Sequence, residues 1–211
     1  ASLAGPVGAA TQGDSIEDFL ASLDSRVFQV GGYGPWPEPL GPIFDNAVSS
    51  YDIPRELLLT LGYMGSAFEN RGDQPTIEYG YGVMALRQNS WGGNSLAAAA
   101  QMLGHALNEM KTDPRWNILG AAAVLDLYAT EENIDRSAGW DAWRPVVVRY
   151  AGLDPESSEV FAQEVFSHLA DGIDATNSQG ERFSFSGQAV TQSPLRVVSE
   201  GYEPMSPDYP P

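Results

Sequence analysis

Apolar residues recur at helical spacing in one segment after another of this chain, and this repeated pattern restricts it to a mainly helical fold. Each segment carries a single apolar stripe, which is typical of helices that pack together around a shared core. The pattern predicts helices over residues 14–26, 43–48, 54–64, 95–109, 113–130, 139–151 and 155–170. A chain with about seven such helices belongs to the mainly α class.

Glycine and proline separate this helical region from both ends of the chain. Residues 1–13 are rich in Ala and Gly, and prolines and glycines are too dense in residues 31–41 for regular structure. Residues 182–186 alternate with period two, which predicts a β-strand, with residues 188–198 as its partner. The expected units are an arm with a short helix and a loop (1–40), a helical domain (41–172), a small strand-rich hairpin appendage (173–199) and a Pro-rich linker (200–211).

The composition excludes several classes of partner and cofactor. The 211 residues carry a net charge of −17, from 28 acidic and 11 basic side chains, so the surface would repel nucleic acid and anionic membranes. No segment reaches the roughly 20 apolar residues of a membrane span. The chain has no cysteine, and its two histidines, His105 and His168, lie far apart without a second ligand at metal-binding spacing. We therefore expect no bound metal and no other cofactor.

Three short segments carry a family resemblance, and they occur in the expected order. They read Leu61-Gly-Tyr-Met-Gly-Ser-Ala-Phe68, Tyr79-Gly-Tyr-Gly-Val-Met-Ala-Leu86 and Arg149-Tyr-Ala-Gly152. Together they resemble the Glu-Ser-x-Phe helix end, the Gly-Leu-Met-Gln turn and the Tyr-Asn/Ser-Gly turn of lysozyme-like, soluble lytic transglycosylase domains. The position of the catalytic glutamate is Gly65, and two further polar positions of the family pattern are Ala85 and Ala151.

The resemblance covers residues 41 to about 170, and it implies a lysozyme-like fold that contacts a peptidoglycan glycan strand. It assigns Tyr150 to the cleft beside the reacting sugar, and it makes Ser66, Tyr81 and Met84 candidate substrate-binding residues. Trp91, in the loop just after the second segment, is the best candidate for stacking on a sugar ring. The order of elements is also similar to the amino-terminal module of bacterial secreted N-acetylmuramoyl-L-alanine amidases. This implies a secreted or cell-wall location and an amidase domain after Pro211.

The chemistry of glycan cleavage makes the glycine at position 65 decisive. Cleavage needs a carboxylic acid whose pKa is raised by an apolar setting, so that it still holds a proton near neutral pH. Gly65 has no such group, and losing a general acid slows a reaction by about 10²- to 10⁴-fold. Glu69 and Glu78 are the nearby carboxylates; each is either a replacement acid or an ordinary solvated side chain at a helix end or in a loop.

Three interpretations follow from these residues. The first is a peptidoglycan-binding module that has lost glycan cleavage, because three positions of the family pattern have changed together. The second is an active muramidase or lytic transglycosylase that uses Glu69 or Glu78 as its acid. The third is a protein-interaction module that keeps the fold without the cleft. The first is the expected function.

Overall fold

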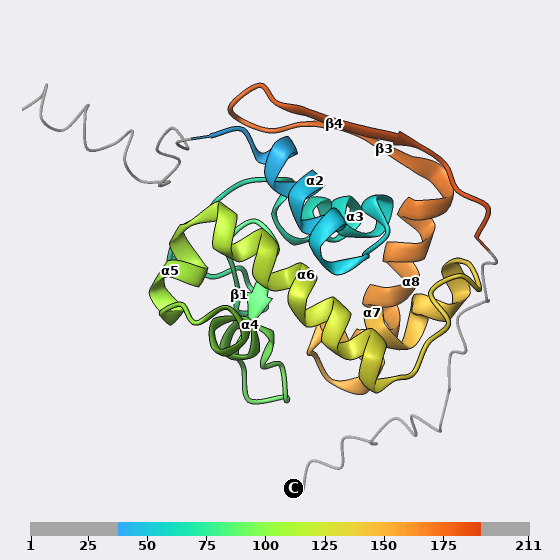
Figure 1. Cartoon of the computed structure of the whole chain (residues 1–211), viewed down its shortest axis with the longest axis horizontal. Coiled ribbons are helices and arrows are strands. Elements are labelled where there is room, and N and C mark those ends of the chain that lie inside the picture. The colour runs from blue at the N-terminus through green and yellow to red at the C-terminus, as the bar shows by residue number, and fades with distance from the viewer. Residues whose placement is uncertain (1–37, 191–211) are drawn as a thin grey trace, which may run out of the picture.

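The computed structural model describes residues 38–190, and within them it is mainly helical with one longer β-hairpin near the end (Figure 1). The helices are α2 (Leu40–Tyr51), α3 (Arg55–Ser66), α4 (Ser95–Leu103), α5 (Leu107–Thr112), α6 (Pro114–Glu131), α7 (Arg144–Ala151) and α8 (Pro155–Asp171), with a 3-10 helix η1 at Trp140–Trp143. The strands are β1 (Gly80–Tyr81), β2 (Leu86–Arg87), β3 (Gly172–Thr176) and β4 (Arg182–Ser186). The predicted fold class is confirmed. The helix expected over residues 14–26 and the linker expected over 200–211 lie outside the described residues.

Helix α6 crosses the middle of the molecule and contacts α2, α4, α5 and α7 (Figure 1). It begins at Pro114, and the side chain of Asp113 accepts a hydrogen bond from the N–H of Arg115 at 2.9 Å. Small residues let its neighbours come close: a Cβ at Gly120 would lie 2.8 Å from the Cβ of Ala99. Its buried surface therefore extends around most of its circumference, as a central helix requires. None of the helices in residues 38–190 combines the length and apolar character needed to cross a membrane.

Two of the expected helices are interrupted. The stretch 95–109 divides into α4 and α5 because Gly104 adopts a left-handed φ of 70° and ends α4. The stretch 139–151 begins as the 3-10 helix η1 and becomes α-helical at Arg144, next to Pro145, whose fixed φ suits a first helical turn. Trp143 of η1 is buried in the core, whereas Trp116 and Trp140 are partly buried against it.

The hairpin β3–β4 shares the core of the helices. Phe183 of β4 stacks on Phe68 at a centroid distance of 4.1 Å and meets Phe44 edge-on at 5.7 Å. The strand β4 pairs in antiparallel register with β3, which the sequence did not predict as a strand. Of the partner expected at residues 188–198, only residues 188–190 are described, and they form no strand; the rest lies outside the described residues. β3 follows α8 without a loop, since Gly172, with φ 84°, turns the chain directly from helix to strand.

Candidate functional site

Helix α3 ends in an unusual backbone conformation just after Gly65. Ala67 and Phe68 both have left-handed φ values, 55° and 62°, and their N–H groups donate back to the carbonyls of Tyr63 and Gly62. Tyr79 and Ala85, across from this helix end, are also left-handed, with φ values of 59° and 49°. Each such residue costs about 1–2 kcal/mol, so the surroundings must hold it in place. Strain of this kind concentrates at functional sites, and here it gathers around the expected position of the catalytic acid.

A short hairpin, β1–β2, lies against this helix end, and buried side chains from three helices hold its turn. Asn117 of α6 accepts a hydrogen bond from the N–H of Met84 at 2.7 Å and donates one to the carbonyl of Tyr81 at 3.0 Å. Ser66 of α3 donates to the carbonyl of Val83 at 2.7 Å. Tyr150 of α7 donates its hydroxyl proton to the carbonyl of Met84 at 2.8 Å. The turn therefore has its buried polar groups satisfied and its position determined from three directions.

Gly65 packs directly on this turn. A Cβ at position 65 would lie 3.0 Å from the Cβ of Ala85, and a Cβ at Gly80 would lie 2.7 Å from the same atom. Ala85 is thus enclosed by two glycines, and its own side chain is almost fully buried. A side chain at residue 65 would therefore press on the turn, and its neighbours would have to shift by a few tenths of an ångström.

An open hollow of about 460 Å³ lies at the same helix end. Its walls come from the last turns of α3, from the loop that follows and from α8; the lining residues are Tyr63, Met64, Gly65, Ser66, Ala67, Arg71 and His168. The imidazole of His168 meets the ring of Tyr63 edge-on at a centroid distance of 5.3 Å. No carboxylate belongs to this lining.

The structure gives three of the predicted substrate-binding residues a supporting position. Ser66, Met84 and Tyr150 are 6%, 1% and 2% exposed, so Met84 and Tyr150 present no surface to a ligand and Ser66 contributes only a small part of the hollow's wall. The hydroxyls of Ser66 and Tyr150 are both committed to the hairpin turn. Burial raises the pKa of Tyr150 above its usual range, and the nearby Arg87 offsets only part of that rise. These side chains hold the site together from beneath.

The two candidate replacement acids are both engaged elsewhere. The two carboxylate oxygens of Glu69 accept hydrogen bonds from the N–H and the hydroxyl of Ser178, in the turn between β3 and β4, at 2.5 and 2.7 Å. Glu78 forms an ion pair with the buried guanidinium of Arg87 at 2.6 Å and is itself half exposed. Neither carboxylate lines the hollow beside Gly65.

Exposed aromatic side chains lie on the loops that flank the short hairpin. Trp91 is 56% exposed, and Tyr79, which the sequence did not single out as a site residue, is 52% exposed with its ring centroid 6.4 Å from that of Trp91. Asn89 fixes the loop: its Oδ1 accepts from the N–H of Trp91, and its Nδ2 donates to the carbonyl of Gly152. Tyr81, the remaining predicted contact, is half buried, and the Lys111 ammonium lies 4.0 Å from its ring centroid.

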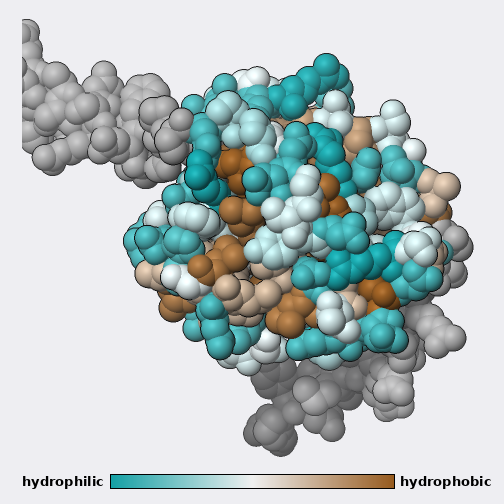
Figure 2. Space-filling model, in the orientation of Figure 1, coloured by the Kyte–Doolittle hydropathy of each residue, from teal (hydrophilic) through white to brown (hydrophobic). Residues whose placement is uncertain are grey.

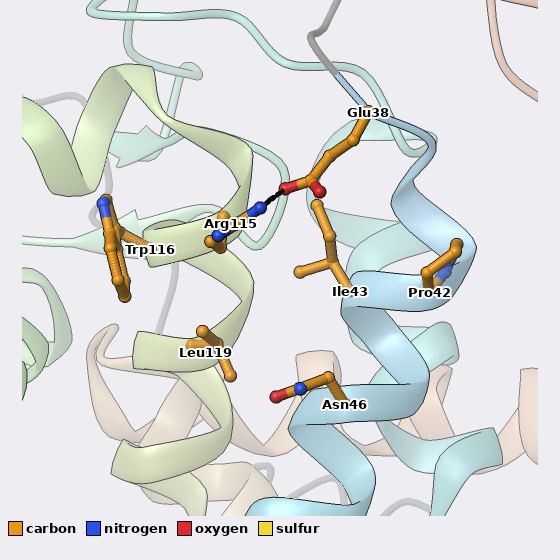
Figure 3. A pocket seen from close by; sticks show the side chains of 7 residues that line it. All are labelled: Glu38, Pro42, Ile43, Asn46, Arg115, Trp116 and Leu119. Atoms are coloured by element: carbon orange, nitrogen blue, oxygen red, sulfur yellow. Dashed lines mark hydrogen bonds and ion pairs between the residues drawn. The ribbon is translucent and has the colours of Figure 1, made fainter.

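A second hollow, of about 350 Å³, lies between α2 and α6 (Figure 3). Arg115 and Glu38 form an ion pair at its rim, with Nε and Oε1 2.7 Å apart. Ile43, Trp116 and Leu119 give it apolar walls, and Figure 3 shows Ile43 and Leu119 in the space between the two helices. None of the residues that the sequence nominated for the site lines it.

The histidines have local partners. His105 stacks on Trp116 at a centroid distance of 3.8 Å, and His168 contacts Tyr63 as described above. Within residues 38–190, no three His, Asp or Glu side chains gather in a way that could hold a metal ion.

The fold and site define a mainly helical domain with a buried, hydrogen-bonded turn beside the end of α3. No family model matches the sequence, and no curated protein matches it either.

Proposed function

We propose that this chain is a lysozyme-like module that binds peptidoglycan glycan strands and has lost glycan cleavage. The observation that carries the proposal is the surroundings of Gly65. Ser66, Asn117 and Tyr150 hold a strained turn against the position where the family resemblance expects the catalytic acid. Four nearby residues, Ala67, Phe68, Tyr79 and Ala85, are left-handed, and backbone strain of this kind is concentrated at functional sites.

The absence of cleavage follows from the carboxylates within reach. A general acid must present a protonated oxygen to the leaving group within hydrogen-bond distance. Glu69 uses both of its oxygens on Ser178, and Glu78 is ion-paired to Arg87. Either residue would have to break these contacts before it could act on a glycan held beside Gly65.

The exposed aromatic pair supports glycan binding. The rings of Tyr79 and Trp91 are accessible to a ligand, and the loop that carries Trp91 is fixed through Asn89. An aromatic face held in this way stacks on the apolar face of a pyranose ring at little cost in conformational entropy. The pyranose rings on which these side chains would stack are uncharged, so this contact is not opposed by the net charge of −17.

We further propose that the module belongs to a secreted or cell-wall-associated hydrolase of the amidase type and acts outside the cytoplasm. In that setting the module would hold the enzyme on its substrate, and a C-terminal amidase domain would cleave the peptide from the glycan. Binding and cleavage would then be carried by different domains, so a glycine at residue 65 would not abolish the function of the whole protein.

Co-sedimentation with insoluble, protein-free peptidoglycan tests binding. We expect the chain to sediment with the polymer, and Trp91→Ala to weaken retention several-fold, up to about tenfold, because the stacking surface is removed. Val160→Ala, which shortens an exposed apolar residue on α8, is the matched control and should bind as the wild type does. Retention no greater than that of an unrelated acidic protein would favour the interaction-module interpretation.

Turbidity of a peptidoglycan suspension tests the rival enzymatic interpretation. We expect no loss of turbidity beyond that of the buffer. A measurable loss that disappears in Glu69→Gln or Glu78→Gln would show that one of these residues has become the acid, and the proposal of lost cleavage would then be wrong.

A further inference from the structure

The hollow at the end of α3 contains an arginine that forms no ion pair with any carboxylate among the residues that the structure describes. Seven of the eight arginines within residues 38–190 form ion pairs, and Arg71 is the exception. Arg71 is exposed and lines the hollow. The chain has 28 acidic side chains against 11 basic ones, so a guanidinium without a carboxylate is an unusual feature of its described surface.

The acidic side chains next to Arg71 in the sequence have other partners. Both oxygens of Glu69 accept hydrogen bonds from Ser178, and Asp73 accepts one from the side chain of Gln74 at 3.1 Å. Neither carboxylate lines the hollow, and neither forms an ion pair with Arg71. The guanidinium is therefore free to meet an incoming anion.

His168 adds a second polar group to the same hollow from α8. An imidazole ring carries at least one N–H donor in either of its protonation states. The end of α3 contributes the negative pole of a helix, worth about half an elementary charge. A full guanidinium charge outweighs this pole, so the hollow as a whole suits a negatively charged group.

We propose that the hollow binds a carboxylate carried by the glycan strand, with Arg71 as its ion-pair partner and His168 as an additional hydrogen-bond donor. The inference rests on the proposed function and specifies which part of the ligand enters the hollow. A peptidoglycan strand has two sources of this chemistry. One is the lactyl carboxylate of muramic acid in a strand without peptides, and the other is a carboxylate of the attached stem peptide.

Calorimetric titration with three soluble ligands tests the assignment. The ligands are a peptide-free disaccharide that contains N-acetylmuramic acid, the same disaccharide with its stem peptide, and a chitooligosaccharide without any carboxylate. Each is titrated into the wild type, Arg71→Gln and Arg55→Gln. The last variant is the matched control. It removes the same charge at the opposite end of α3, from a partly exposed residue that is paired with Asp45.

We expect Arg71→Gln to raise the Kd of a carboxylate-bearing ligand about tenfold and to leave the Kd of the chitooligosaccharide unchanged. Arg55→Gln should leave all three values unchanged. If Arg71→Gln loses affinity only for the peptide-free disaccharide, the bound group is the lactyl carboxylate. If it loses affinity only for the peptide-bearing ligand, the bound group is a carboxylate of the stem peptide.

The result that overturns this inference differs from the one that overturns the proposed function. If Arg71→Gln binds all three ligands as tightly as the wild type, the hollow does not read a carboxylate, although glycan binding stands. If the wild type binds none of the three ligands and does not sediment with peptidoglycan, the proposed function fails and the inference fails with it. Circular dichroism confirms that each variant is folded before its Kd is compared.

Discussion

Asn117, Ser66 and Tyr150 are single residues whose buried polar groups determine where the 82–85 turn lies. Each contributes only about 1 kcal/mol net as a hydrogen bond, because water would otherwise satisfy the same groups. Removing one of them costs more, since the partner is left buried without a hydrogen bond. None of these hydrogen bonds involves residue 65. Two predictions at this scale concern the turn.

Restoring a carboxylate at residue 65 is expected to restore weak cleavage. In Gly65→Glu the new Cβ would lie 3.0 Å from the Cβ of Ala85, so the neighbouring side chain has to move slightly. Adding Ala85→Gly removes that contact and also relieves the left-handed φ of 49°. The relief of about 1–2 kcal/mol roughly offsets the lost methyl group and the added backbone entropy, so stability changes little.

Mass spectrometry of soluble products from peptidoglycan provides the readout for this pair of substitutions. The double variant should release the most soluble fragments and Gly65→Glu fewer. The wild type and Ala85→Gly alone should release no more than background. A folded double variant that releases no soluble fragments would show that more than the acid has been lost from the site.

Tyr150→Phe is expected to change how stability depends on pH. Burial raises the pKa of Tyr150, so this phenol stays protonated in the folded state where the unfolded chain begins to ionise, near pH 10. Above that pH the unfolded state binds fewer protons, and the free energy of unfolding falls by up to about 1.4 kcal/mol per pH unit from this group. Below pH 10, the contribution of Tyr150 to the free energy of unfolding is fully present. The phenylalanine variant has no phenol, so it does not lose this contribution at high pH.

Urea denaturation at pH 7, 10 and 11 measures the effect. At pH 7 the variant should be less stable than the wild type by about 1–2 kcal/mol, because the carbonyl of Met84 loses its donor. Between pH 10 and pH 11 the difference should narrow. Parallel losses in the two proteins would mean that the phenol of Tyr150 is not protected in the folded state.

Among the secondary-structure elements, the β3–β4 hairpin depends most on distant parts of the chain. Period-two alternation identified β4 correctly, but it could not identify the partner strand. β3 was hidden because Gly172–Thr176 continues directly from α8, and Ile173 extends the apolar pattern of that helix. The hairpin also supplies an N-terminal cap for α2. Pro39, at the start of α2, has no side chain that could accept a hydrogen bond from the first N–H groups of the helix.

Glu181 provides this cap from the hairpin. Its carboxylate accepts hydrogen bonds from the N–H groups of Leu40 and Gly41 at 2.8 and 2.6 Å. We expect Glu181→Ala to lower the free energy of unfolding by about 1–3 kcal/mol, because two N–H groups at the start of the helix lose a charged acceptor. Glu164→Ala, which removes an exposed carboxylate from α8, should change it by less than about 0.5 kcal/mol.

Chemical denaturation followed by far-UV circular dichroism compares the two variants under identical conditions. Equal midpoints would show that the contact between Glu181 and α2 contributes nothing, and that the hairpin is held by Phe183 and its aromatic neighbours alone.

The whole molecule carries far more negative than positive charge, and this excess covers its surface. Acidic side chains outnumber basic ones by 28 to 11, which gives the net charge of −17. Figure 2 shows one face on which hydrophilic side chains surround several separate hydrophobic patches. Repulsion among unpaired carboxylates opposes the compact state, and exposed ion pairs offset it by only about 0–1 kcal/mol each.

Added salt is therefore expected to stabilise the protein. Screening weakens long-range repulsion once the Debye length falls to about 10 Å, near 0.1 M ionic strength. The Tm should rise between about 10 mM and 0.3 M sodium chloride at pH 7, as followed by circular dichroism. A Tm that falls over this range would indicate that the ion pairs contribute more to stability than the repulsion removes.

Local patterns were sufficient to locate the described helices, apart from the breaks at Gly104 and before Arg144, and to locate one strand. The apolar stripe of Leu57, Leu58 and Leu61 predicted α3, and Asp113 with Pro114 predicted the start of α6, because these features depend on neighbours only a few residues away. The three motif segments could also be recognised from the sequence. How they contact one another could not, because Asn117, which bonds two backbone groups of the turn to α6, belongs to none of the three segments.

The sequence by itself determined that the chain is mainly helical, that residue 65 has no side chain to act as an acid, and that the molecule is strongly acidic. Only the tertiary structure decided that Ser66 and Tyr150 support the turn from beneath, that Glu69 is bound to Ser178, and that Arg71 and His168 share one hollow. The reason is physical. Periodicity and composition report local preference and charge, whereas burial and hydrogen-bond partners are set by residues tens of positions apart that meet only when the chain has folded.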